Sequence, residues 1–213
     1  MTHAHASIES DTVHRLSHHD FRRLRHIDRN TRLREQIIDL VRAYRRSEYI
    51  GGNAMVETMA QEIGFEPHDL CICDIRINGR LVTLICVPHN VWNRAYAMGR
   101  VIDLRFRARK AGYNVVLVPQ GFVERQPRSD NASMLRRLAK VRVDATTRMI
   151  ILAHLIENGD CALAELADLI EHPDPFGAVL HLVAVGAVSI DINQCITPYT
   201  MVGLPDPRSS IAN

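Results

Sequence analysis

Long apolar runs, a secretory leader and lysine are scarce or missing in this sequence of 213 residues. No stretch reaches the roughly 18 consecutive apolar residues that a membrane helix needs, so we expect no membrane partner. The N-terminus is polar and rich in histidine, without the charged-then-apolar pattern of a signal peptide. This pattern predicts a cytoplasmic protein, in which the five cysteines would stay reduced.

Lysine occurs only at Lys110 and Lys140, so arginine makes up nearly all of the 26 basic residues. The planar guanidinium suits two-pronged contacts to phosphates and to base edges. This favours a nucleic-acid partner. A genome rich in G and C, which prefers arginine codons, would produce the same bias.

Basic residues are almost absent from the last third of the chain, where only Arg148 and Arg208 follow position 142. Residues 1–142 hold 24 basic and 15 acidic residues, a net charge of +9. Residues 143–213 hold 2 basic and 9 acidic residues, a net charge of −7. Such a split indicates two parts that bind different partners or bind each other.

The basic part has the pattern of a small α/β domain. We expect residues 1–28 to form a flexible, histidine-rich arm, because they show no apolar period. Apolar spacing, β-rich runs and the Asn78-Gly79 turn signal predict the elements of residues 29–125. These are a helix from residue 30 that Gly51-Gly52 stops, a helix at 53–63, a hairpin of 70–78 with 81–87, a helix at 91–111 and a strand at 114–119. They predict a small mixed sheet flanked by helices.

The rest of the chain is predicted to be helical. A polar loop at 124–131 leads to a basic helix, and we expect the segment 126–142 to bridge the two parts. Residues 143–202 show three helices followed by a hairpin, which is the order of a winged helix. Residues 203–213 are predicted to be a frayed tail.

The hairpin carries the strongest hint of catalytic chemistry, because Asp74 lies mid-strand in ICDIRING and is followed by the buried strand LVTLICV. Together with NVVLVPQGF and GAVSIDINQCITPYT, this order resembles the PD-(D/E)xK nuclease superfamily over residues 30–202. It looks most like the TnsA-like endonuclease subunit of heteromeric transposases. The resemblance implies a Mg²⁺ or Mn²⁺ site built from Asp74 and a helix carboxylate, Glu57 or Glu62.

The chain departs from that family at the end of the second hairpin strand. Where such nucleases carry an acidic residue or glutamine, one spacer and a lysine, this sequence reads Cys86-Val87-Pro88. We therefore expect a scaffold without catalysis and without a cofactor. An active nuclease would instead need Glu62 and Asp74 close together with Mg²⁺ or Mn²⁺. Asp74 could also simply pair with Arg76 or Arg80.

Cysteines and basic residues complete the set of candidate sites. Cys71, Cys73 and Cys86 are expected to pack in the core, because their spacing does not match that of zinc ligands. The helix at 91–111 and the bridging helix are predicted to bind DNA phosphates. Their residues are Arg94, Arg100, Arg105, Arg107, Arg109, Lys110, Arg136, Arg137 and Lys140.

The predicted recognition helix of the winged helix, PFGAVLHLVAVG, lacks side chains that could contact base edges. With acidic residues around it, this module is expected to bind a protein partner or a second copy of the chain.

The sequence leaves three possible functions for the whole chain. The first is a DNA-binding regulatory or accessory protein on a degenerate nuclease scaffold. The second is an active metal-dependent endonuclease, and the third is a protein-interaction module without a nucleic-acid role.

Overall fold

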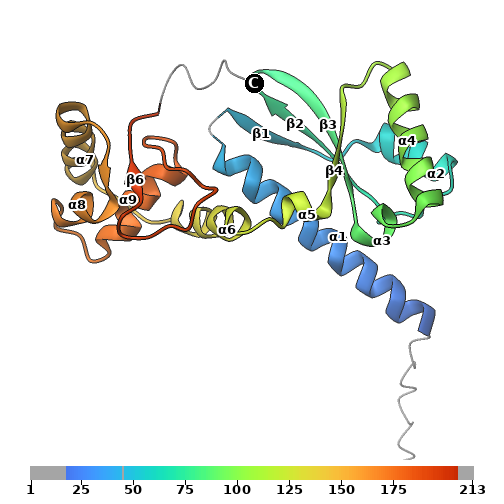
Figure 1. Ribbon diagram of the computed structural model, residues 1–213, viewed down its shortest axis with the longest axis horizontal. Coiled ribbons are helices and arrows are strands. Elements are labelled where there is room, and N and C mark those ends of the chain that lie inside the picture. Colours follow the sequence, from blue (N-terminus) through green and yellow to red (C-terminus); the bar gives the residue numbers. More distant parts are fainter. Residues whose placement is uncertain (1–17, 45, 206–213) are drawn as a thin grey trace, which may run out of the picture.

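A four-stranded mixed sheet organises the first part of the chain in the computed structural model, which describes residues 18–44 and 46–205 (Figure 1). The strands are β1 (Ser47–Gly51), β2 (Cys71–Ile77), β3 (Arg80–Val87) and β4 (Val115–Pro119), in the spatial order β1-β2-β3-β4. The first three are antiparallel, and β4 runs parallel to β3. The predicted mixed sheet flanked by helices is confirmed.

The β2–β3 hairpin turns at Asn78 and Gly79, whose φ angles are 50° and 78°. Two consecutive positive φ angles are the requirement of the tight turns that Asn-Gly favours. This turn sets the pairing, so that Ile77 lies opposite Arg80 and Asp74 lies opposite Thr83. The predicted hairpin is confirmed, and its register decides which side chains share a face.

The edge strand β1 was not predicted. The helix predicted from residue 30 was expected to be stopped by Gly51-Gly52, but α1 (His18–Ala43) ends earlier and Ser47–Gly51 pairs with β2. The helix also begins twelve residues before position 30, so it includes part of the segment that was expected to form the arm. Residues 1–17 of that arm lie outside the described residues.

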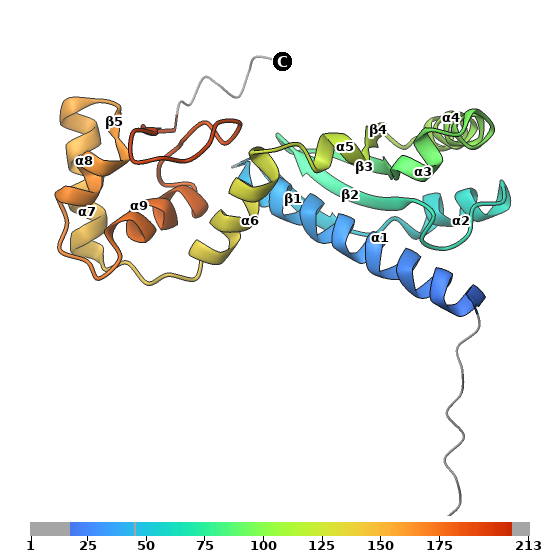
Figure 2. The same ribbon diagram turned by 60° about the horizontal axis from the view of Figure 1, so that its bottom comes forward.

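Helices cover both faces of the sheet (Figure 2). On one face, Leu33 and Ile37 of α1 pack with Cys71, Cys73 and Cys86, so the predicted core position of these cysteines is confirmed. On the other face lie α2 (Ala54–Glu62) and α4 (Ala95–Lys110). Two separate apolar cores therefore sandwich the sheet.

The single helix predicted for 91–111 is two helices, α3 (His89–Trp92) and α4, with a break at Asn93 and Arg94. Its predicted apolar stripe included Ile102 and Phe106, but the structure leaves both exposed. The buried face of α4 is formed instead by Val101, Leu104 and Ala108. Both sets have helical spacing, and the sheet contacts only the second.

After β4 the chain forms α5 (Gln120–Val123) and α6 (Arg128–Leu138), so the loop expected to extend to residue 131 ends at Pro127. α6 contacts both α1 and α9. Its Ala132 belongs to the core beneath the sheet, and its Leu135 belongs to the core of the C-terminal part.

The C-terminal part contains α7 (Ala145–Asn158), α8 (Leu163–Asp168) and α9 (Pro175–Ala184), close to the predicted positions. β5 (Cys161–Ala162) pairs with β6 (Met201–Val202). The predicted hairpin of 188–192 with 196–202 is not formed. Instead, an isolated antiparallel β-bridge pairs Ser189 with Gly203. None of the described helices is long and apolar enough to cross a membrane.

Candidate functional site

Asp74 lies in a compact polar cluster on the sheet face that α2 covers. Asn53 donates from Nδ2 to both carboxylate oxygens of Asp74, at 3.0 and 3.1 Å. Thr83 donates from Oγ1 to Oδ1 at 2.7 Å. Asn53 and Thr83 are both buried, and Asp74 is partly buried. Asp74 therefore pairs with Asn53 and Thr83, and the expectation of Arg76 or Arg80 as its partner was wrong.

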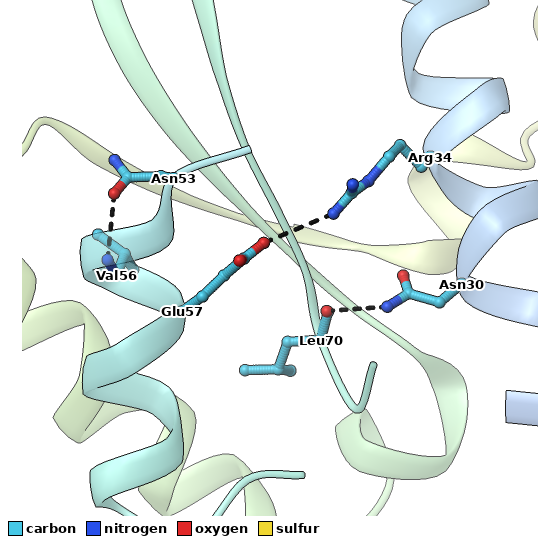
Figure 3. A network of polar contacts seen from close by, with 6 residues as sticks. All are labelled: Asn30, Arg34, Asn53, Val56, Glu57 and Leu70. Atoms are coloured by element: carbon cyan, nitrogen blue, oxygen red, sulfur yellow. Dashed lines mark hydrogen bonds and ion pairs between the residues drawn. The ribbon is translucent and has the colours of Figure 1, made fainter. Parts of the chain in front are cut away.

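Asn53 also begins α2. Its side-chain oxygen accepts a hydrogen bond from the Val56 backbone N–H at 3.1 Å, which is the geometry of an N-cap (Figure 3). One amide group thus caps the helix with its oxygen and binds the sheet carboxylate with its nitrogen. This double use ties α2 to β2 and β3.

The register corrects the comparison of Cys86-Val87-Pro88 with the nuclease motif. The β3 residue opposite Asp74 is Thr83, and the residue two positions further along the same face is Ile85. Cys86 lies opposite Cys71 and packs on the other face of the sheet. The β3 positions on the Asp74 face are therefore a threonine, Thr83, and two buried apolar residues, Ile85 and Val87.

Glu62 is not brought to Asp74. It ends α2, nine residues after Asn53, which corresponds to ~13 Å along the helix axis. Glu57, one turn into α2, lies closer to the sheet and forms an ion pair of 3.5 Å with Arg34 of α1 (Figure 3). The active centre proposed from Glu62 and Asp74 is not assembled.

Arg34 and Glu57 meet beside a pocket of about 350 Å³ whose lining includes Asn30, Leu70 and Ile72. Asn30 is buried and donates from Nδ2 to the Leu70 carbonyl at 3.1 Å, as Figure 3 shows. Its Oδ1 has no hydrogen-bond partner among the described residues. The pocket therefore offers a buried acceptor next to a charged pair.

The thiols nearby are held in their neutral form. Burial raises the pKa of Cys73 to about 12. Burial also raises the pKa of Cys71, although a hydrogen bond and the positive charge of Arg34 oppose this change. Because the thiolate is the nucleophile and the metal ligand, these cysteines are suited to packing.

Some of the predicted phosphate-binding residues at α4 are exposed to solvent, and others contact neighbouring groups of the fold. Arg100 stacks on Phe65, 4.2 Å from the ring centroid, and Arg105 is half-buried. Arg107 pairs with Asp103 at 2.9 Å, and Arg109 donates to the Val115 carbonyl at 3.2 Å. Arg94 and Lys110 are exposed. α4 thus uses much of its positive charge in contacts within the fold.

The second predicted cluster lies in a groove of about 1280 Å³ between the sheet-containing part and the C-terminal part. The groove is lined by the end of α1, by α6, and by residues after α9. Its described lining contains five basic side chains, Arg42, Arg46, Arg136, Arg137 and Lys140, and three acidic ones, Asp39, Asp160 and Asp191. Sequence patterns identified Arg136, Arg137 and Lys140 as candidate phosphate contacts, and the structure brings Arg42 and Arg46 to the same groove.

Asp39 is the buried acid of this groove. Its Oδ1 lies 3.0 Å from Nε of Arg136. Burial raises the pKa of Asp39, and the charges of Arg136 and Arg42 oppose this effect. Arg137 and Lys140 are exposed beside this pair, so their charge faces the groove's solvent.

No known protein family, curated protein or solved structure matches the chain. Function must therefore be argued from the groove and the polar cluster themselves.

Proposed function

We propose that this protein binds nucleic acid in the groove between its two parts and acts as a regulatory or accessory factor. The observation that carries the proposal is the concave lining with five basic side chains drawn from α1, α6 and their flanking residues. A concave basic surface can contact several phosphates at once, and each contact releases counterions. Phosphate contacts of this kind give affinity without sequence specificity.

The packing of the acidic part leaves two of these basic side chains exposed. Its contacts with α6 include Leu135, which lies in its apolar core, and His181, whose Nδ1 is 3.1 Å from the Leu138 carbonyl. Arg137 of α6 and Lys140, two residues after its end, are both exposed. This arrangement supports a basic groove that stays open to a polyanion.

A nuclease-like scaffold without hydrolysis fits the polar cluster. The mixed sheet, with α4 crossing from β3 to the parallel strand β4, is consistent with the resemblance to the PD-(D/E)xK superfamily. The carboxylate of Asp74 is engaged by two neutral donors, Asn53 and Thr83. We therefore propose binding without cleavage, with the C-terminal part as a winged helix for protein contact.

The test is the binding of a fluorescent DNA duplex, followed by anisotropy across a salt series. We expect Arg137→Glu with Lys140→Glu to weaken binding at least tenfold and to lower the salt slope by about 2, since two phosphate contacts are lost. The matched control is Arg32→Glu with Arg125→Glu, which makes the same change of charge at two exposed residues outside the groove lining. Equal losses in both variants would contradict the groove as the binding site.

Incubation of the same protein with plasmid and Mn²⁺ tests the absence of cleavage. We expect intact plasmid. Nicking or linearisation that Asp74→Asn abolishes would instead support an active endonuclease. Salt-independent anisotropy, with no binding even at low salt, would support a protein-interaction module.

A further inference from the structure

α4 carries an exposed apolar seam on the side facing away from the sheet. Its residues are Ala95, Gly99, Ile102 and Phe106, which follow one another at spacings of four, three and four. Ile102 is 58% exposed and Phe106 is 69% exposed. Alternating spacings of three and four are typical of a helix face that packs lengthwise against another helix. We call these four residues the α4 seam.

α7 carries a second seam of the same kind. Thr146, Met149, Ala153 and Ile156 follow at spacings of three, four and three, and all are exposed. Met149 and Ile156 are each 70% exposed. The opposite face of α7 packs inward through Thr147, Ile151 and Leu155. We call the exposed set the α7 seam.

The C-terminal ends of the two helices carry opposite charges. The last turn of α4 holds exposed Arg107, Arg109 and Lys110. The last turn of α7 holds exposed Glu157 and no basic residue. If the two helices pack in parallel, their C-terminal ends meet and these groups attract each other, whereas two parallel α4 helices would bring like charges together.

The seams lie at opposite ends of the molecule, as both ribbon views show (Figures 1 and 2). One chain therefore cannot pair its own α4 with its own α7. In a homodimer with a two-fold axis, a contact between α4 of one copy and α7 of the other occurs twice.

We propose that the chain forms a homodimer in which the α4 seam of each copy packs against the α7 seam of the other. Each seam has a small residue, Gly99 or Ala153, between larger ones, and a side chain placed at Gly99 would meet no atom within 4 Å. The helices can therefore approach closely at these points. This interface differs from the groove, so it does not depend on the proposed nucleic-acid function.

Sedimentation velocity over a range of protein concentrations measures the association. We expect the unchanged protein to be dimeric at micromolar concentration and to dissociate as salt rises. Phe106→Glu and Ile156→Lys should each raise the dimer dissociation constant about 100-fold or more, because each variant removes both symmetric contacts. Tyr199→Glu, at an exposed residue outside both seams, is the control and should leave the dimer unchanged.

A mixture of the two variants identifies the pairing. The Phe106→Glu chain keeps an intact α7 seam, and the Ile156→Lys chain keeps an intact α4 seam, so one contact can form between them. We expect the mixture to associate more strongly than either variant alone. Monomeric unchanged protein, loss with Phe106→Glu but not with Ile156→Lys, or no recovery in the mixture would each overturn the proposal. Melting curves that match those of the unchanged protein in dilute solution show that each variant folds.

Discussion

Asn53 joins two functions that a single side chain seldom combines, since it caps α2 and also binds the carboxylate of Asp74. Asp74 was the residue on which the nuclease resemblance depended. Its contacts give it a structural task, because its carboxylate positions the amide that starts α2. The partners of Asp74 therefore indicate its role more directly than its position within the strand does.

Replacing Asn53 with alanine tests this task. The change removes the helix cap and leaves Asp74 without its amide donor in a partly buried place. We expect the free energy of unfolding to fall by about 2 to 4 kcal/mol, from the cap and the charged hydrogen bond together. Urea unfolding measures it. Thr58→Ala on the same helix removes only an exposed contact to the Ala54 carbonyl and should change stability by no more than about 0.5 kcal/mol.

The raised pKa of Asp39 predicts how the stability of the fold depends on pH. Burial raises its pKa above the ordinary 3.8, so the folded protein holds this proton to higher pH than the unfolded chain does. Its contribution to stability is therefore most favourable below pH 3.8 and is lost as pH rises through the folded pKa. We expect Asp39→Asn to be more stable than the unchanged protein at neutral pH, with the difference vanishing in acid. Urea unfolding at several pH values measures this difference.

Asp191 provides the comparison of opposite sign. Hydrogen bonds from the backbone and side chain of Asn193 lower the pKa of Asp191. Asp191→Asn should therefore reduce stability above pH 3.8, and the loss should disappear as pH falls through the lowered folded pKa. The same trend with pH for both variants would contradict the assigned causes.

The pairing of Asp74 with Thr83 could have been predicted from the turn alone. A two-residue turn at Asn78-Gly79 pairs Ile77 with Arg80, and counting back along both strands places Asp74 opposite Thr83. The resemblance instead drew attention to Cys86, which lies on the other face. Asn53 could not be found this way, since its contact with Asp74 depends on how α2 packs on the sheet.

At the scale of elements, strong local signals predicted the hairpin, β4 and the helices of the C-terminal part. The failures have physical causes. β1 is five residues long and is held by pairing with β2, which no local pattern reveals. α4 has two apolar faces with helical spacing, and only the tertiary contact decides which one is buried. Periodicity alone could not choose between them.

Two alanine substitutions on α4 test that choice. Leu104 is fully buried against the sheet, so Leu104→Ala should lower the free energy of unfolding by about 2 to 5 kcal/mol. Ile102→Ala, on the exposed face, should cost no more than about 0.5 kcal/mol in dilute protein, where the chain is monomeric. Urea unfolding measures both. The reverse order would mean that the face containing Ile102 is buried.

At the scale of the whole molecule, α6 is the element that joins the two parts. Ala132 packs beneath the sheet, and Leu135, one turn later, packs in the C-terminal core. Asn131 reinforces this connection, because its Nδ2 donates to the carbonyls of Ile192 and Gln194 at 2.9 and 2.7 Å. The same helix presents Arg136 and Arg137 to the groove, and Lys140 follows just after its end. The shape of the proposed binding surface therefore depends on α6 staying packed on both sides.

Separate cores on either side of α6 predict a local response to mutation. Leu135→Ala should cost about 2 to 5 kcal/mol, and its loss of hydrogen-exchange protection should be largest in α7, α8 and α9. Leu104→Ala should instead affect α4 and the strands β2 to β4, because Leu104 belongs to the core above the sheet. Hydrogen exchange followed by mass spectrometry compares the two variants. Equal loss of protection throughout the chain in both would show that the parts unfold as one unit, and the groove would then be as rigid as the cores that flank it.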